Sequence, residues 1–194
     1  MVKNFKYLVS IVNRNHEEAF IAPLKNNLPI QHDTSKGGYS VNSVIKFYVS
    51  SYIHSHFSDS LSLSIFSGGD FHILGALFNN KLINTSKFVM GVTTASGTNY
   101  FMTINDDNSF MKFYNKYLSS KVSYLKLENK YDDYNIDSKN SVGNNELGFL
   151  MMLTKESTGI SLLKTDSNCE NANILSLSSD KKSVIQTPCV NLLN

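Results

Sequence analysis

The chain has 194 residues, 41% of them hydrophobic, and a formal net charge of +2. That length and composition suit one globular domain that folds without disulfides, and they exclude a disordered chain. Only one of the 18 basic residues is an arginine, Arg14, and the lysines are scattered. Because bidentate recognition of phosphate and guanine favours arginine, we expect no nucleic-acid partner.

The sequence also lacks a membrane-spanning pattern, since no apolar run approaches the roughly 20 residues needed to cross a bilayer. Residues 1–15, MVKNFKYLVSIVNRN, hold lysines and a short apolar stretch but no small-residue cleavage site. We therefore expect a strand or short helix there rather than a signal peptide. The expected location is cytoplasmic, with no membrane partner.

The first part of the chain predicts strands separated by polar turns. Residues 20–24, FIAPL, favour a strand, and the turn-rich residues 25–40 favour a loop or hairpin region. The following segment predicts a helix beginning near Val41 and then a strand over residues 52–57. The serine-rich residues 58–66 are expected to form a loop.

The middle of the chain predicts two helices around a hairpin. Residues 67–83, SGGDFHILGALFNNKLI, favour a helix, because four apolar residues form one stripe at helical spacing: Ile73, Leu74, Leu77 and Phe78. Residues 87–106 hold two β-rich runs around a Ser-Gly turn, which predicts a hairpin. Residues 109–118, SFMKFYNKYL, predict an amphipathic helix.

The last third begins with an almost wholly polar stretch, residues 128–145, which we expect to be a long exposed loop or a disordered link. Residues 146–157 then predict a helix and residues 158–166 a strand. Strand-like alternation is weak beyond that point. We expect a mixed α/β domain over residues 1–165, with a mixed β-sheet flanked by helices, and an irregular C-terminal extension over residues 166–194.

The two cysteines, Cys169 and Cys189, have no histidine near them in the sequence, since the last third contains none. This pattern argues against a metal site made by the thiols. We expect two unpaired thiols, or a disulfide if the protein is exported.

One constellation carries chemistry. Ser67-Gly-Gly-Asp70 before an apolar run has the pattern of a helix capping box, and His54-Ser-His56 on a strand needs no function by itself. Side chains at i and i+2 of a strand point to one face, however, and the loop that follows can bring Asp70 to the same point. Two imidazoles and one carboxylate with an open fourth position are typical of a catalytic zinc site.

The order His-x-His, loop, Ser-x-x-Asp, with a glutamate upstream, resembles the signature of the JAMM/MPN+ zinc metalloproteases. HSHFSDSLSLSIFSGGD matches that motif, and the following helix and hairpin are similar to the elements after it. The resemblance covers roughly residues 8 to 118. Two features depart from the family pattern: Phe57 replaces the usual proline after the second histidine, and ten residues separate His56 from Ser67, a longer interval than usual.

The resemblance implies a role for each position. His54 and His56 would bind Zn²⁺ as neutral imidazoles, and Asp70 would bind it as a carboxylate. Ser67 would donate its hydroxyl to the developing oxyanion as well as capping the helix. The general base would be one of the two glutamates before the histidines, Glu17 or Glu18.

Of these two glutamates we favour Glu17 as the base, because the small and apolar residues Ala19 and Ile21 share its face of the strand. His72 is expected to be an exposed helix residue. Two further histidines, His16 and His32, are assigned no role. The acidic run Asp132-Asp133 with Asp137 lacks the glycine and terminal glutamate of a calcium-binding EF-hand, so we expect a solvated loop.

The implied activity is hydrolysis of a peptide or isopeptide bond by zinc-activated water, with an extended peptide or a ubiquitin-like conjugate as substrate. The alternative is a catalytically weak or inactive MPN-like module that binds proteins. A nucleic-acid-processing relative of the same fold is disfavoured by the single arginine.

Overall fold

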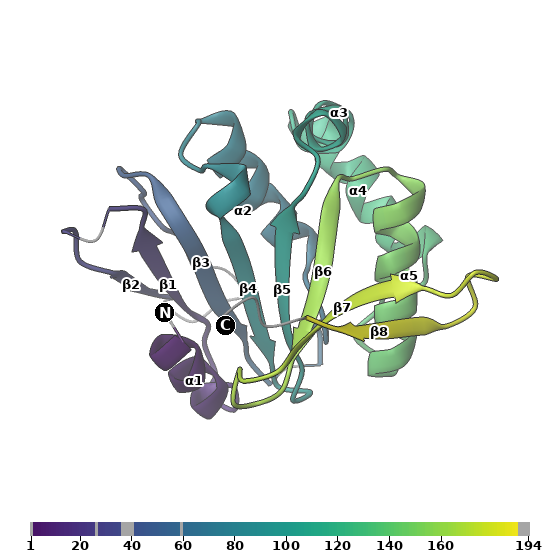
Figure 1. The fold of residues 1–194 in the computed structure, drawn as a ribbon, viewed down its shortest axis with the longest axis horizontal. Coiled ribbons are helices and arrows are strands. Elements are labelled where there is room, and N and C mark those ends of the chain that lie inside the picture. Colours follow the sequence, from purple (N-terminus) through teal and green to yellow (C-terminus); the bar gives the residue numbers. More distant parts are fainter. Residues whose placement is uncertain (1, 26, 36–40, 59, 190–194) are drawn as a thin grey trace.

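The computed structural model describes residues 2–25, 27–35, 41–58 and 60–189. Within them the chain forms one eight-stranded mixed sheet with five α-helices (Figure 1). The elements are α1 (Val2–Ile11), β1 (Glu18–Pro23), β2 (Gln31–Thr34), β3 (Val49–His56), α2 (Gly68–Asn79), η1 (Thr85–Lys87), β4 (Val89–Thr94), β5 (Asn99–Ile104), α3 (Asp107–Tyr117), α4 (Lys121–Asp133), α5 (Val142–Lys155), β6 (Ile160–Thr165), β7 (Ala172–Leu177) and β8 (Val184–Pro188). No helix in these ranges is long and apolar enough to cross a membrane.

The sheet order is β2-β1-β3-β4-β5-β6-β7-β8, and every neighbouring pair is antiparallel except β3 and β4. The parallel pair is connected through α2, as parallel strands require a crossover. The parallel pair therefore brings the end of β3 and the start of α2 to the middle of the sheet, between β1 and β5.

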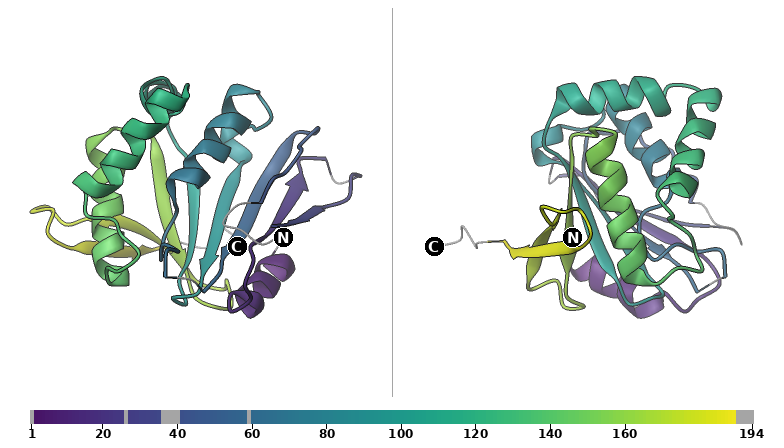
Figure 2. Two further views of the ribbon diagram at one scale, coloured as in Figure 1. Left: turned by 180° about the vertical axis from the view of Figure 1, so that it is seen from behind. Right: turned by 90° about the vertical axis from the view of Figure 1, so that its right-hand side faces the viewer.

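The two faces of the sheet are covered unequally. The main hydrophobic core joins α2, α3, α4 and α5 to one face, and it includes Tyr52, Phe71 and Phe149. A smaller cluster joins α1 to the other face through Phe5 and Ile53. Figure 1 shows α1 apart from the other helices, and Figure 2 shows α3, α4 and α5 grouped together.

Most of the expected elements are confirmed. The strand in residues 20–24, the helix in 67–83, the hairpin in 87–106, the helix in 109–118, the helix in 146–157 and the strand in 158–166 correspond to β1, α2, β4–β5, α3, α5 and β6. The start of the chain takes the helical alternative as α1, and residues 25–40 include β2, which pairs with β1. Of that segment, residues 26 and 36–40 lie outside the described residues.

Three expectations were wrong. No helix begins near Val41: residues 41–48 form neither a helix nor a strand and lead into β3 at Val49. The polar stretch 128–145 is mostly helical, because α4 runs to Asp133 and α5 starts at Val142. The segment after residue 165 is not irregular, since β7 and β8 continue the sheet beyond β6.

The physical reasons lie in packing rather than in local sequence. Ile45 and Phe47 pack against the core from a segment that is neither helix nor strand. Helix α4 buries Leu127 and Tyr131, four residues apart, and Ser120 caps its start. These few contacts with the core are enough to hold an otherwise polar helix in place.

Candidate metal centre

The candidate site lies where β3 ends and α2 begins. All residues of β3 from Ser51 to His56 are buried, because β1 and β4 flank the strand in the sheet. His54 is paired with Ala19 on one side and Val92 on the other. The period of two along the strand puts the side chains of His54 and His56 on the same face, toward α2.

Helix α2 brings its first turn to this face through a capping box. Ser67 is the N-cap with an extended backbone, its hydroxyl accepts from the Asp70 amide, and the Asp70 carboxylate accepts from the Ser67 amide. The Ser67 nitrogen lies 2.7 Å from Asp70 Oδ2. The expected cap is therefore confirmed, and it fixes the Asp70 carboxylate over the end of β3.

Three side chains converge there. Asp70 Oδ1 lies 2.8 Å from His54 Nε2, and Asp70 Oδ2 lies 3.3 Å from His56 Nε2. The two Nε2 atoms are 3.2 Å apart. All three residues are at most 5% exposed. Each offers one ligand atom within 4.8 Å of the others, so this buried group could hold a metal ion.

The spacing of the donor atoms suits a tetrahedral ion. Two ligands held about 2.0–2.1 Å from a zinc ion at the tetrahedral angle lie about 3.3 Å apart. The separation of the two Nε2 atoms, 3.2 Å, is close to that value, and each Nε2 lies 2.8 or 3.3 Å from a different oxygen of Asp70. The two facing Nε2 atoms interact favourably when one carries a proton and donates it to the other, or when both bind one metal ion.

The electrostatics of the group also favour a cation. Burial opposes ionisation of Asp70, but the imidazoles of His54 and His56 outweigh it and hold the pKa of that carboxyl well below its usual range. Burial likewise opposes a charged His56, yet the Asp70 carboxylate raises the pKa of this imidazole to about 9. The carboxylate thus holds positive charge at the point where the donors meet.

Contacts outside the three donors orient the histidines unequally. His56 Nδ1 lies 3.1 Å from the Leu63 carbonyl oxygen, to which it donates, so Nε2 is left for a metal. His54 Nδ1 is buried and has no hydrogen-bond partner among the described residues. The residues between the strand and the helix therefore fix the tautomer of His56 but not that of His54.

Glu17 precedes β1 and joins the group. Continuing the β1–β3 register, in which Ala19 is opposite His54, by two residues places Glu17 opposite His56. Glu17 is 7% exposed. Desolvation raises its pKa to about 7, an effect opposed by His56 and His54 and reinforced by Asp70. Its backbone amide donates to Ser35 Oγ, which anchors the residue.

A cleft of about 500 Å³ opens beside His56, one of the three donors. Glu17, His56 and Ser67 contribute to its lining. The opposite side comes from α4 and the residues that follow it: Tyr124, Glu128, Tyr131, Asp132, Ile136, Asp137 and Ser138. The sequence did not predict this side of the cleft, because the polar residues 128–145 were expected to form an exposed loop or a disordered link.

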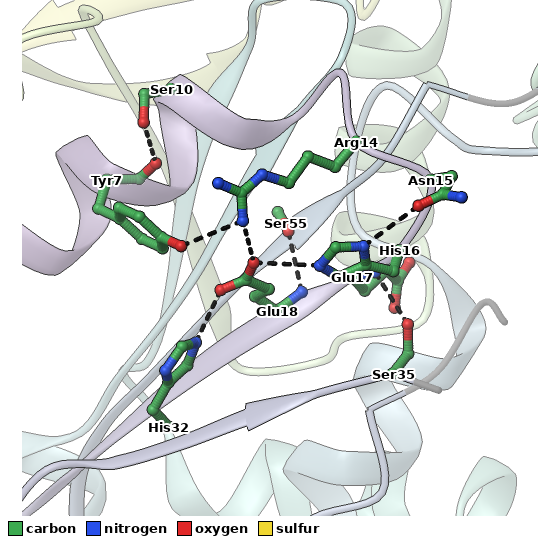
Figure 3. A network of polar contacts seen from close by, with 10 residues as sticks. All are labelled: Tyr7, Ser10, Arg14, Asn15, His16, Glu17, Glu18, His32, Ser35 and Ser55. Atoms are coloured by element: carbon green, nitrogen blue, oxygen red, sulfur yellow. Dashed lines mark hydrogen bonds and ion pairs between the residues drawn. The ribbon is translucent and has the colours of Figure 1, made fainter. Parts of the chain in front are cut away.

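Glu18, the other candidate base, lies on the opposite side of β1 from Glu17. Its carboxylate lies among Arg14, His16 and His32 (Figure 3). The nearest atoms are Arg14 Nη1 at 2.9 Å, His16 Nε2 at 3.1 Å and His32 Nε2 at 2.7 Å. Glu18 is thus held by a cluster of its own, and the two histidines without an expected role belong to that cluster.

The remaining candidates take ordinary positions. His72 is exposed on α2, as expected, with its ring 5.6 Å from that of Tyr124. Cys169 and Cys189 are free thiols, both partly buried, which agrees with the first of the two alternatives for them.

The structure therefore brings together five residues predicted from the sequence: Glu17, His54, His56, Ser67 and Asp70. No protein-family model, curated protein or solved structure matches the chain.

Proposed function

We propose that this chain is a zinc-dependent hydrolase of peptide or isopeptide bonds with a JAMM/MPN-like fold. The observation that carries the proposal is the convergence of His54, His56 and Asp70 beside Glu17 at an open cleft. The donor set favours zinc, because two imidazoles and one carboxylate are ligands that zinc takes in catalytic sites and leave a fourth position open.

A zinc ion held by these three residues supplies a Lewis acid that lowers the pKa of water to about 7. Glu17 supplies the proton acceptor. A pKa of about 7 suits a residue that takes a proton from water and returns it to a leaving amine near neutral pH. Glu17 lines the cleft, in which both partners of that transfer would be bound.

Ser67 has a second task in this proposal, since its hydroxyl would donate to the carbonyl oxygen of the substrate. In the structure the same hydroxyl lies 3.0 Å from Asp70 Oδ2 and accepts from the Asp70 amide at 3.3 Å. The hydroxyl proton is therefore already directed to Asp70. Donation to a substrate requires the Ser67 side chain to rotate away from Asp70 while the Ser67 amide keeps its bond to Oδ2.

That shared proton favours one second candidate, an MPN-like binding module with little or no hydrolytic activity. In such a module, Asp70 would serve as a cap and as the counter-ion of two buried histidines. The two functions differ in whether metal binding is followed by bond cleavage.

Zinc content per chain of the purified protein tests the proposal first. We expect about one zinc per chain in the wild type and none in His56→Ala and Asp70→Ala. The control is His72→Ala, which changes an exposed histidine of α2, the helix that holds Asp70, and should keep its zinc. The zinc-loaded protein is then incubated with a mixture of peptides and with a lysine-linked isopeptide. Cleavage that is lost in Glu17→Gln, which keeps its metal, supports the hydrolase; zinc binding without any cleavage supports the binding module.

No metal in the wild type after reconstitution would contradict both the zinc site and the hydrolase. The group would then act as a buried ion-paired cluster that fixes α2 against β3.

A further inference from the structure

The cleft beside the three donors is acidic. Its lining contains four carboxylates, from Glu17, Glu128, Asp132 and Asp137, and no lysine or arginine. The whole chain carries a small net charge of +2, whereas the acidic residues of the lining outnumber its basic ones. His56 is the one basic side chain in the lining, beside Glu17, and the carboxylates on the other side of the cleft attract ligand groups of positive charge.

Three of these residues form a wall that comes from outside the segment resembling a known family. Glu128 and Asp132 are on the exposed side of α4, one turn apart, and Asp137 follows in the connection to α5. We refer to Glu128, Asp132 and Asp137 as the acidic wall. None of them makes a salt bridge with any residue in the described part of the chain.

The existing contacts of the acidic wall are with neutral groups. The Glu128 carboxylate raises the pKa of the neighbouring Tyr124 hydroxyl, after burial, and Asp137 Oδ1 accepts from the Lys139 amide at 2.7 Å. No side-chain partner of Asp132 occurs among the described residues. Within the described ranges, no ion pair compensates the negative charge of the wall.

Glu128 connects the wall to the candidate centre. Its Oε1 lies against Gly68, the first residue of α2, where the Cβ of any other residue would overlap it. Gly68 directly follows Ser67, so a cationic group that reached Glu128 would lie beside the residue proposed to hold the substrate carbonyl. A carboxylate at this place is itself favoured by the amide groups of the helix N-terminus.

A second observation points to a ligand in the same cleft. Glu17 is 7% exposed, lines the cleft, and its carboxylate makes no hydrogen bond to any described side chain or backbone group. A carboxylate in a largely buried side chain is costly unless it has a partner or meets solvent, and Glu17 meets the cleft. It therefore faces the space in which a substrate would be bound.

The wall does not resemble a second metal site. The only group of histidine, cysteine or acidic residues in the described ranges with donors close enough for one ion is His54, His56 and Asp70. Carboxylates spread along a cleft suit an elongated cation better than a compact one. Tyr124, Tyr131 and Leu63 in the same lining offer apolar surface for a long side-chain stem.

We propose that the acidic wall of α4 and the following turn selects a substrate segment with a lysine or arginine side chain next to the bond that is cleaved. The bond cleavage rests on the proposed function, whereas the preference for a cationic side chain is a property of binding and can be tested without cleavage. The cationic head would lie among Glu128, Asp132 and Asp137, and the stem would lie along Tyr124 and Tyr131.

The test measures binding apart from cleavage. Two short fluorescein-labelled peptides of alanine, glycine and serine are compared by fluorescence polarisation on the zinc-loaded protein; they differ only in a central lysine or norleucine. We expect the lysine peptide to bind roughly tenfold more tightly, because exposed charge pairs contribute modestly and three carboxylates act together. The preference should shrink as salt is raised, since exposed charges are screened.

A variant with Glu128→Gln and Asp132→Asn should lose most of the preference. The matched control is Asp133→Asn with Glu170→Gln, which removes the same charge from exposed positions that do not line the cleft. Equal affinity for the two peptides in the wild type, no binding of the lysine peptide at millimolar concentration, or the same loss of preference in the control would overturn the proposal.

Cleavage of the same peptides is measured in parallel. A lysine preference in binding without any cleavage would refute the hydrolase and leave the cation-selective cleft standing. Cleavage of both peptides at equal rates and with equal affinity would support the hydrolase and refute the cation-selective cleft.

Discussion

Glu17→Gln and Glu18→Gln are expected to change the stability of the chelator-treated protein in opposite directions. The two residues are neighbours at the start of β1, and both are almost completely buried, at 7% and 2% exposed. Their surroundings differ. Glu18 has three nitrogen donors within 3.1 Å, whereas the Glu17 carboxylate has no hydrogen-bond partner among the described residues.

The magnitude for Glu17 follows from its pKa. A rise from 4.5 to about 7 means that the ionised side chain destabilises the fold by roughly 3 kcal/mol, because a tenfold change in an equilibrium constant is worth about 1.4 kcal/mol. The folded state binds more protons than the unfolded state between pH 4.5 and about 7. Wild-type stability should therefore fall as pH rises through this range, and Glu17→Gln should remove the loss.

Glu18→Gln should change the free energy of unfolding in the opposite direction and destabilise the fold. Burial opposes its ionisation, but hydrogen bonds from His32 and His16 and the charge of Arg14 outweigh burial and lower its pKa. Removing the charge should cost about 1.5–3 kcal/mol, the usual range for a hydrogen bond to a charged group. This contribution is fully present above pH 4.5 and is lost as pH falls through the lowered pKa of the folded state.

Urea unfolding of the wild type and both variants at pH 8 and pH 5, with chelator throughout, measures these differences. At pH 8 we expect Glu17→Gln to be more stable than the wild type by up to roughly 3 kcal/mol, with a smaller gain at pH 5. Glu18→Gln should be less stable than the wild type at both pH values. A Glu17→Gln protein that is less stable than the wild type at pH 8 would refute the reasoning from burial.

Three further outcomes are expected. Zinc at 100 times its dissociation constant should stabilise the wild type by about 2.7 kcal/mol. For a chain of this size, that raises the melting temperature in scanning calorimetry by roughly 5–11 °C. The same measurement should show no such rise in His56→Ala. Ser67→Ala should lower the free energy of unfolding by about 1 kcal/mol through loss of the α2 cap, and a loss near zero in chemical denaturation would contradict that role. Gly148→Ala should cost about 1–3 kcal/mol, because its Cβ would overlap the Tyr134 carbonyl oxygen; Gly143→Ala in the same helix meets nothing within 4 Å and should leave the urea midpoint unchanged or higher.

The candidate donors could be predicted from the sequence because local rules determine where they point. The period of two places His54 and His56 on one face of β3, and the capping box places Asp70 in the first turn of α2. The same alternation separates Glu17 from Glu18. None of these steps depends on which other elements surround the site.

Helix α4 could not be predicted in the same way. Its buried residues, Leu127 and Tyr131, are few, and they are fixed by distant contacts such as the hydrogen bond from the Tyr131 hydroxyl to the Phe66 carbonyl at 3.0 Å. The cluster around Glu18 depends on the pairing of β1 with β2, which places His32 opposite Phe20. Such partners are far apart in the sequence, so periodicity does not reveal them.

The opposite energetic signs of the two glutamates bear on function. A protein gains nothing in stability from a buried, ionised carboxylate without hydrogen-bond partners, and such groups are typical of sites where chemistry needs a shifted pKa. Glu18 has a structural reason for its place, since it joins β1 to β2 through His32 and to the α1–β1 connection through Arg14 and His16. Glu17 has none of that kind, and it lies opposite His56 in the register of β1 and β3. A gain in stability on its replacement, together with a loss of cleavage, would therefore identify Glu17 as a residue that serves the reaction at the expense of the fold.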